Sequence, residues 1–421
     1  MKQRHLFLTV LLLCALTAHA QVKTPVINML THWTGTWATA EQTPVKSYMP
    51  YNNEMTDRSV RQIVKVSAGG SRVRLLLSNI FSSEPVVIRS VYIAEAIDSF
   101  RIKPSTARYL TFGTSGRGVT IPARGSVYSR AENFDLRPLE LVAITINYQT
   151  APKVPTVHMG SRTTSYILKG VSTPQTNFSS AFRYEKWFNI AALDVYATDL
   201  RAIAIIGNSI TDGKGSTTDH QNRWPDIMSE SLNRAFLKQI SIGTKSTDKT
   251  GKANDRQTAV LNLGIGNNRV LTTGYGQPAV DRFDRDILAQ SGVTDVIIFE
   301  GINDIGNTRN AATTARQLIA AYKQMIAKCK ARKLRVYMAT ITPMKGSAYY
   351  TAAREQARQT VNKWIREQKE ATGYIDFDKL MRDPDDPRAL RPHCCPTACT
   401  PTPKAISRWA HTPLKSSNNC S

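Results

Sequence analysis

The feature that most constrains the fold is a change in the periodicity of hydrophobic residues close to residue 195. Before it, from about residue 26, short segments alternate apolar and polar residues and are separated by turn residues. After it, short apolar runs rich in β-branched residues alternate with stretches of helical periodicity. The first pattern predicts an antiparallel β-sandwich or jelly-roll-like domain. The second predicts a three-layer α/β domain around a parallel sheet.

The clearest strand signal of the first half is a pair of period-2 runs, residues 61–66 and 72–77, on either side of Gly69-Gly70. Two such runs around two glycines predict a β-hairpin. Further strand-like runs cover residues 85–94, 109–112, 118–121 and 139–148. Many short strands separated by turns are typical of an antiparallel sandwich.

The strand signal of the second half lies in five short apolar runs, at residues 202–206, 259–263, 296–299, 336–341 and 374–377. Helical periodicity is clearest in residues 311–330 and 351–369. Parallel sheets bind ligands at the carboxyl ends of their strands, so we expect the functional residues directly after these runs. The predicted organisation is a leader at residues 1–20, a β-rich domain at 21–195, an α/β domain at 196–390 and an aberrant tail at 391–421.

The predicted leader has the pattern of an export signal. Lys2 and Arg4 give it a positive start, residues 6–16 are apolar, and Ala18-His19-Ala20 offers a small-x-small cleavage site. No later segment approaches the ~18 apolar residues that a membrane helix needs. We therefore expect an exported protein, periplasmic or extracellular, with no integral membrane segment after cleavage.

Composition excludes some classes of protein. With 41% hydrophobic and 21% charged residues, the chain of 421 residues is not a disordered polyelectrolyte. The net charge of +23 is spread over both halves, and no nucleic-acid motif accompanies it, so we expect a solvated basic surface and no nucleic-acid partner. Nothing in the sequence indicates an oligomeric state.

Polar residues with chemical potential follow the first apolar run of the second half. Ser209 lies in Gly207-Asn208-Ser209, where a turn after a buried strand would expose its hydroxyl ahead of a helix. A nucleophile needs this fixed backbone, free hydroxyl and nearby amides. Taken alone, however, a Gly-x-Ser turn is more often an ordinary loop.

The second and third runs end in two further candidates. Gly264-Ile265-Gly266-Asn267 can turn sharply and present a backbone amide to a ligand. In Gly301-Ile302-Asn303-Asp304, the Asn303 side chain can offer its NH₂ group to a developing oxyanion, although a turn or helix cap is an equally good interpretation of this asparagine alone.

Together and in this order, the three segments resemble the conserved blocks of the SGNH (GDSL-type) hydrolase family. Asn208 stands where aspartate is usual, and Asn267 falls where the oxyanion glycine is usual. Asparagine tolerates a positive φ better than most residues and keeps its N–H, so the donor can survive. Segments at residues 32–38, 223–226, 282–286 and 361–365 also resemble secreted two-domain members, and the resemblance covers about residues 30–390.

The resemblance implies a serine carboxylester hydrolase. Ser209 would attack the ester, while the amides of Ser209 and of Gly266 or Asn267, with the Asn303 side chain, hold the oxyanion. Family analogy and export together favour a carbohydrate O-deacetylase acting on an acetylated polysaccharide. No cofactor or metal is expected. The alternatives are a lipid or lysophospholipid esterase, and a non-catalytic glycan-binding protein that uses Trp33, Trp37 or Trp224, although buried tryptophans are commoner.

The general base and its aspartate are missing from the place where the family has them. Members carry Asp-x-x-His-Pro near the C-terminus, and this chain has no such motif. His393 is a weak substitute and His411 a formal one, because neither has an aspartate two or three positions before it. His220 is best interpreted as a solvated loop residue, and His32 and His158 are assigned to the β-rich domain.

The tail also departs from the rest of the chain. It contains no acidic residue. Four cysteines lie within the last 28 positions, with a spacing that does not suit a zinc site: Cys394, Cys395, Cys399 and Cys420. Codons compatible with residues 396–410, read two bases later, can encode Asp-Cys-Leu-His-Pro. We therefore hypothesise a slip of reading frame between about residues 390 and 396, which would leave the chain as written impaired. Cys329 is separately expected to be a buried thiol on the 311–330 helix.

Overall fold

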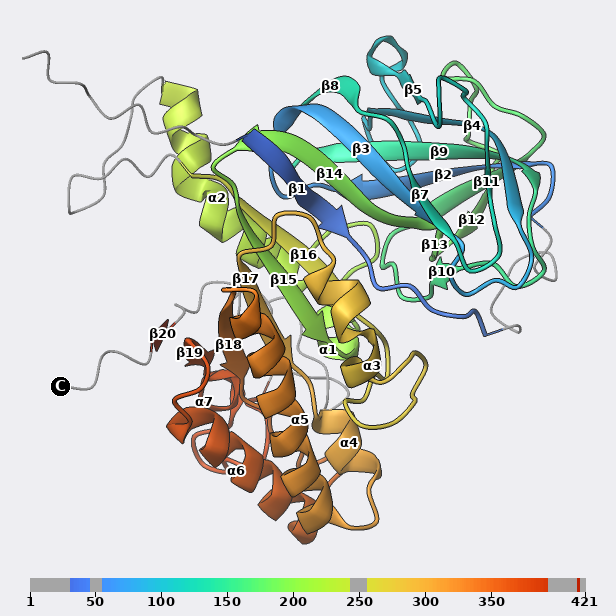
Figure 1. Cartoon of the computed structure of the whole chain (residues 1–421). Helices are drawn as coiled ribbons and strands as arrows, with labels where there is room; N and C mark the ends of the chain where they lie inside the picture. Colours follow the sequence, from blue (N-terminus) through green and yellow to red (C-terminus); the bar gives the residue numbers. More distant parts are fainter. Residues whose placement is uncertain (1–30, 46–54, 243–255, 393–414, 417–421) are drawn as a thin grey trace, which may run out of the picture.

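The computed structural model describes residues 31–45, 55–242, 256–392 and 415–416. The predicted leader and the tail residues 393–414, including His393 and His411, lie outside this description. The described residues form an antiparallel β region followed by an α/β region, which lie side by side (Figure 1). Among them, no helix combines the length and apolarity that a membrane crossing requires.

Two antiparallel sheets enclose the core of the N-terminal β region, as the alternating pattern predicts. The five-stranded sheet has the order β1-β14-β3-β7, with β8 also on β3; the seven-stranded sheet has the order β12-β11-β2-β9-β4-β5, with β6 also on β4. A separate pair, β10 (Val157–His158) and β13 (Trp187–Phe188), lies beside them. The sheet strands are β1 (Thr31–Ala38), β2 (Arg58–Lys65), β3 (Gly70–Ser78), β4 (Val86–Glu95), β5 (Arg108–Leu110), β6 (Val119–Ile121), β7 (Ser126–Tyr128), β8 (Glu132–Leu136), β9 (Leu141–Thr150), β11 (Ser165–Lys169), β12 (Phe182–Tyr184) and β14 (Ile190–Thr198).

The hairpin predicted around Gly69-Gly70 is wrong. β2 pairs with β9 and β11 in one sheet, whereas β3 pairs with β14, β7 and β8 in the other. The glycines serve the crossing between the sheets, because a Cβ on Gly69 would overlap Leu136 O and one on Gly70 would lie 2.5 Å from Val195 Cγ2. Close backbone approach, rather than a tight turn, therefore explains the pair.

The parallel sheet of the C-terminal region confirms the five predicted strands. Its order is β16-β15-β17-β18-β19, and β20 (Lys415–Ser416) adds an antiparallel edge. This order places β15 second from the edge, between β16 and β17. The predicted boundary at residues 195 and 196 falls within β14 and stays a prediction. The parallel strands are β15 (Arg201–Gly207), β16 (Thr258–Gly264), β17 (Asp295–Phe299), β18 (Arg335–Ala339) and β19 (Gly373–Ile375).

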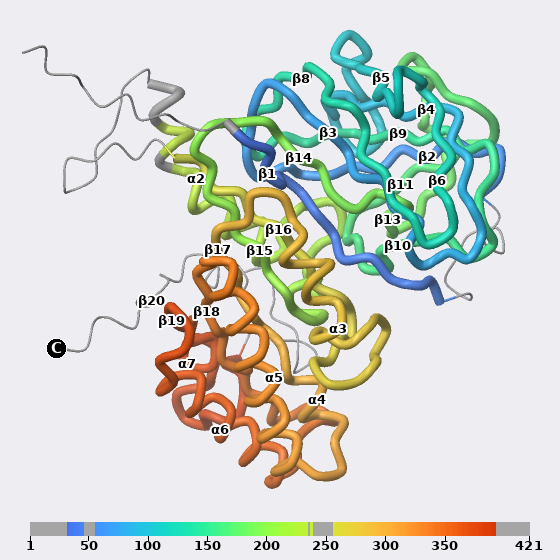
Figure 2. Tube along the Cα trace, viewed as in Figure 1, coloured from blue at the N-terminus to red at the C-terminus, as the bar shows by residue number. Residues whose placement is uncertain are grey.

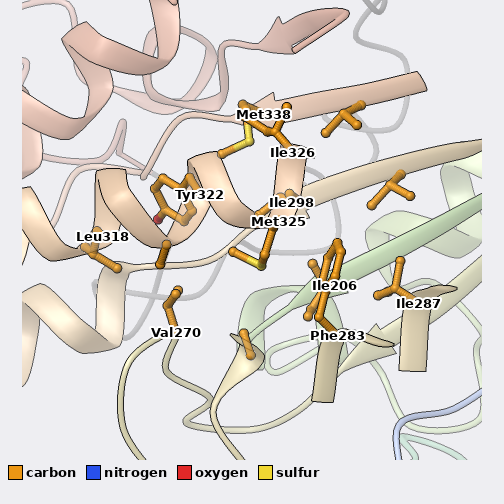
Figure 3. Packing of buried hydrophobic residues seen from close by; sticks show 14 of the residues in the cluster. Ile206, Val270, Phe283, Ile287, Ile298, Leu318, Tyr322, Met325, Ile326 and Met338 are labelled. Carbon is orange, nitrogen blue, oxygen red and sulfur yellow. The ribbon is translucent and has the colours of Figure 1, made fainter. Parts of the chain in front are cut away.

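Helices cover both faces of this sheet and produce the expected three layers. One face packs its apolar side chains against α3 (Ala279–Phe283), the π-helical turn Asp284–Leu288, α5 (Ala311–Ala331) and α6 (Ala352–Glu367). Figure 3 shows this core, in which Ile206 and Ile298 of the sheet lie near Phe283 and Met325 of the helices. The other face packs against α1 (Ser209–Asp212), α2 (Trp224–Ile242) and α7 (Phe377–Met381).

The predicted helices at residues 311–330 and 351–369 are confirmed by α5 and α6. Cys329 is a free, buried thiol on α5, as expected, and burial raises its pKa to about 12. A thiol so protonated is a poor nucleophile.

The β region and the α/β region share a packed boundary rather than a linker (Figure 2). A Cβ on Gly35 of β1 would lie only 3.0 Å from the Leu261 side chain of β16. Hydrogen bonds also cross the boundary, such as that from Val260 N–H to Ser67 Oγ (2.9 Å). The edge strand β16 is thereby covered, which removes an exposed sheet edge.

Candidate active site

Ser209 occupies the position expected of it, on the first turn after β15, the first strand of the parallel sheet along the chain. β15 ends at Gly207, Asn208 caps α1 by accepting the N–H of Ile210 (3.0 Å), and Ser209 is the first residue of this helix. No larger residue fits at Gly207, because a Cβ there would overlap Thr211 Oγ1. The turn therefore presents a hydroxyl and helix N-terminal amides at the carboxyl end of the sheet.

The segment after β16 lies against this turn. Ile265 N–H donates to Gly207 O (3.0 Å), so the two segments continue the parallel pairing of Gly207 with Gly264. Asn267 has a φ of +52°, the conformation that the sequence suggests asparagine can adopt in place of glycine. Within the described part of the chain, the N–H groups of Gly266 and Asn267 donate to no acceptor. They are the kind of free donors that an oxyanion requires.

Asn303 joins the third segment to the second. It lies in α4 (Ile302–Asn307), where its Nδ2 donates to Asn268 O (2.8 Å) and its Oδ1 accepts from Tyr349 Oη (3.0 Å). These two bonds fix the orientation of the amide, and one of its two N–H bonds is left for a further acceptor. The three segments that the sequence singled out are therefore brought together.

A buried charged network supports the three segments from behind. Arg282 is fully buried and donates to Leu263 O (2.8 Å), Gly207 O (3.2 Å) and Asn268 Oδ1 (2.7 Å). It also pairs with Asp286 at 2.9 Å. Sequence reasoning noted the Arg282–Asp286 segment only as part of the resemblance and gave it no role. An arginine and an aspartate at i and i+4 beside apolar residues were the available signal.

The departure at Asn208 is matched by a buried glutamate. Asn208 Nδ2 donates to Glu300 Oε2 (3.3 Å), and Arg282 lies 3.8 Å from Glu300 Oε1. Burial raises the pKa of Glu300 to about 8, although Arg282 and Asn208 act in the opposite direction. An aspartate at position 208 would place two carboxylates face to face, which asparagine avoids.

Asp304 holds the loop after the second segment. Its carboxylate accepts the N–H groups of Val270 (2.9 Å) and Leu271 (3.0 Å). Burial raises its pKa to about 6, against these two backbone hydrogen bonds. Asp304 is therefore an anchor of the loop rather than a partner for a histidine.

Among the described residues, no histidine is hydrogen-bonded to the Ser209 side chain. His220 is exposed in the loop after α1, as its interpretation as a solvated residue implies. His158 is buried and hydrogen-bonded to Asp212, a contact that sequence reasoning missed because the two residues are 54 positions apart. Of the tryptophans considered for sugar binding, Trp37 and Trp224 are buried in apolar cores, which is the commoner alternative.

Comparison with models of known protein families finds a match in the second half of the chain. Residues 205–393 match the model of the GDSL-like Lipase/Acylhydrolase family. No curated protein matches the chain.

Several solved structures are similar at low identity. A family two carbohydrate esterase from Cellvibrio japonicus is 11% identical, with a TM-score of 0.34 over 91% of this chain and 96% of that one. Est24, a carbohydrate acetylesterase from Sinorhizobium meliloti, is 12% identical, with a TM-score of 0.36 over 50% of this chain and 95% of that one. A GDSL-like lipase from Bacteroides thetaiotaomicron is 19% identical, with a TM-score of 0.32 over 50% of this chain and 83% of that one. TM-scores this low transfer nothing to this chain.

Proposed function

Because its C-terminal half belongs to the GDSL-like lipase/acylhydrolase family, whose members hydrolyse esters, we propose that the chain is a serine carboxylester hydrolase with Ser209 as nucleophile. One observation carries this proposal. Ser209, the unpartnered amides of Gly266 and Asn267, and the fixed amide of Asn303 lie on three segments that follow neighbouring strands of the parallel sheet. Hydrogen bonds from Ile265 N–H to Gly207 O and from Asn303 Nδ2 to Asn268 O join these segments. A nucleophile beside several oxyanion donors is the arrangement that acyl transfer requires.

In the proposed mechanism, Ser209 Oγ attacks the ester carbonyl carbon and the carbonyl oxygen becomes an oxyanion. The N–H groups of Ser209 and of Gly266 or Asn267, with Asn303 Nδ2, stabilise this charge. The alcohol leaves with a proton, and water then hydrolyses the acyl-enzyme. A histidine has to carry these protons, since a serine hydroxyl at its ordinary pKa is a weak nucleophile.

The missing histidine is explained by the proposed slip of reading frame. The family match ends at residue 393, inside the tail where the shifted codons can encode Asp-Cys-Leu-His-Pro. The chain as written would then keep its nucleophile and oxyanion donors but lose its base. Resequencing the gene tests this: codons that cannot encode the motif in the shifted frame contradict the hypothesis.

Hydrolysis of p-nitrophenyl acetate tests the proposed activity. It is measured for the chain as written, for a version with the restored Asp-x-x-His motif, and for Ser209→Ala in that restored version. We expect the restored version to exceed the chain as written by several orders of magnitude, and Ser209→Ala to abolish the gain. A restored version no faster than its Ser209→Ala variant contradicts the proposal.

For the substrate, we propose an O-acetylated carbohydrate. The supporting observation is Tyr275, a 63% exposed aromatic side chain whose Cδ2 lies 3.8 Å from where a Gly266 Cβ would be. Its loop is anchored by Gln42 Nε2, which donates to Tyr275 O (2.8 Å). An exposed ring beside the oxyanion donors can stack on a sugar whose acetyl group enters the site.

The substrate proposal is tested with Tyr275→Ala. We expect a raised KM for acetylated oligosaccharides and little change for p-nitrophenyl acetate, which has no sugar to stack. Phe182→Ala, at an exposed aromatic residue on the edge strand β12, is the matched control. Faster cleavage of long-chain than of acetyl esters would favour the lipid esterase alternative.

We further propose that the protein is exported. N-terminal sequencing of the mature protein would support this if the first residue found is residue 21.

A further inference from the structure

A buried histidine of the β region is bonded to the helix that carries Ser209. His158, in β10, places Nε2 3.0 Å from Asp212 Oδ1, and both side chains are 3% exposed. Asp212 is the last residue of α1, one turn after Ser209. The pair therefore joins two regions that are far apart in sequence.

Hydrogen-bond geometry requires a shared proton in this pair. His158 Nδ1 lies 2.7 Å from Ala40 O, and a carbonyl oxygen only accepts, so Nδ1 carries a hydrogen. A neutral ring protonated at Nδ1 would then turn the lone pair of Nε2 toward a carboxylate. Only an imidazolium beside an ionised Asp212, or a protonated Asp212 beside a neutral ring, satisfies both contacts.

The surroundings hold the pair in place. His158 stacks on Trp187, with ring centroids 5.5 Å apart. The charged groups that share its small cavity, Lys65, Arg223 and Asp226, are already paired: Lys65 with Glu230 and Arg223 with Asp226. Among the described residues, His158 is therefore the hydrogen-bonding partner of the Asp212 carboxyl group.

The Asp212 carboxylate also reaches the oxyanion segment. Its Oδ2 lies 3.5 Å from where a Gly266 Cβ would be, and a Cβ on Gly160 would overlap it. Asp212 N–H donates to Asn208 O (2.9 Å), the residue before Ser209. Whatever fixes Asp212 thus fixes both the nucleophile helix and its distance from the neighbouring donors.

We propose that His158 is a positioning residue, through which the N-terminal β region holds the nucleophile helix in register with the oxyanion donors. The proposal rests on the proposed role of Ser209. It gives the β region a part in the reaction beyond covering the edge of the sheet. Neither His158 nor Asp212 needs to touch the substrate.

The test compares His158→Phe with Asp212→Asn in the full chain. Phenylalanine keeps the ring stacked on Trp187 but removes both hydrogen bonds. Asparagine at 212 can donate to a neutral Nε2 while Nδ1 still donates to Ala40, so it keeps every contact without the extra proton. His220→Gln, at the exposed histidine beyond α1, is the control.

Hydrogen exchange of the chain as written gives the first readout. We expect His158→Phe to speed exchange in residues 208–213 and 264–268 while α5 and α6 are unaffected, and Asp212→Asn and His220→Gln to match the parent. Unchanged exchange in these two segments of His158→Phe overturns the proposal. This readout needs no activity and so does not depend on Ser209 being the nucleophile.

The second readout is the steady-state kinetics of p-nitrophenyl acetate hydrolysis, measured with the version that has the restored Asp-x-x-His motif. We expect His158→Phe to lower kcat about tenfold to a hundredfold, the cost of a small misplacement of reacting groups, with KM within about twofold. Asp212→Asn should keep kcat, because the asparagine amide can retain the contact with His158. A parental kcat in His158→Phe overturns the proposal, whereas inactivity of the parent itself counts against the proposed function alone.

Discussion

Asn208 and Glu300 illustrate how one substitution within a motif is balanced by its surroundings. The asparagine amide donates to the glutamate, and the fully buried Arg282 lies on the other side of the same carboxyl group. Glu300 Oε1 has no hydrogen-bond partner among the described residues. A carboxyl group in this position is held with its proton at neutral pH, since burial outweighs the partners that favour its charge.

Glu300 makes stability depend on pH in a predictable direction. Its pKa is about 8 in the folded chain against an ordinary value of 4.5, so the folded state holds the proton more tightly than the unfolded state. The resulting stabilisation is fully present below about pH 4.5 and is lost as pH rises through about 8. We expect Glu300→Gln to gain roughly 4 kcal/mol relative to the parent between pH 5 and pH 8.5.

Urea unfolding of both proteins at several pH values measures this difference. Glu41 is also buried, with a pKa of about 8, and it makes the stability of both the parent and the variant depend on pH. The effect of Glu300 is therefore the difference between the unfolding free energies of the two proteins at each pH. A constant difference in unfolding free energy across this pH range would contradict the prediction.

Asn303 is expected to act directly on the oxyanion. In the active version, Asn303→Ala should lower kcat about 10²–10³-fold, as removal of a single oxyanion donor does elsewhere. Tyr349→Phe is the matched control, because it removes the bond accepted by Asn303 Oδ1 and the one donated by Asn307 Nδ2 but leaves the Asn303 NH₂ group. Steady-state hydrolysis of p-nitrophenyl acetate decides the matter, and an equal loss in both variants would show that Asn303 acts through its packing.

At the scale of elements, the short helix α1 depends on close contact with its neighbours. It has only four residues, so it cannot be stable by itself and is held by β15, β16 and the β region. The glycines of the first two segments make these contacts possible. Sequence reasoning gave them the role of turning the chain, whereas the structure shows that Gly207 and Gly264 also make room for α1.

Gly264 offers a direct test of this packing. A Cβ at this position would overlap Asp212 N–H, a backbone atom that cannot turn aside. We expect Gly264→Ala to destabilise the chain by about 1–3 kcal/mol, as overpacking does, and to lower activity further by moving Ser209. Thermal unfolding measures the first effect. Gly116→Ala is the control, since its nearest contact would be an ordinary 3.5 Å, and equal stability of the two variants would contradict the prediction.

The elements themselves follow closely from the hydrophobic pattern. All five parallel strands and the helices α5 and α6 form where periodicity predicts them, because a buried strand and an amphipathic helix each carry a distinct period. The predicted hairpin fails because two strands joined by glycines can turn within a sheet or cross between sheets. Local sequence is the same in both cases, and only the partners of β2 and β3 distinguish them.

At the scale of the whole molecule, the two regions form one packed body. The core of the β region includes Ala202 and Ala259 of the parallel sheet, and the core of the α/β region includes Ala38 and Ala192 of the antiparallel one. Separate domains joined by a polar linker do not share core residues in this way. The β region is therefore part of the support of the active site.

Shared cores predict cooperative unfolding of the described regions. We expect a single calorimetric transition, with equal calorimetric and van't Hoff enthalpies, because neither region can open without exposing the apolar surface of the other. Two resolved transitions would show independent domains. A variant that opens the boundary, such as Gly35→Leu against Leu261, should lower the single transition rather than split it.

The sequence alone determined the two classes of structure and predicted that the functional segments follow the first three parallel strands. It also singled out the candidates Ser209, Gly266, Asn267 and Asn303. These follow from periodicity and from short motifs, which are local properties of a chain. Tertiary structure decided the network of Arg282, the glutamate behind Asn208, and the bond from His158 to Asp212. Burial and contacts between distant segments create these features, and neither is written in any local stretch of sequence.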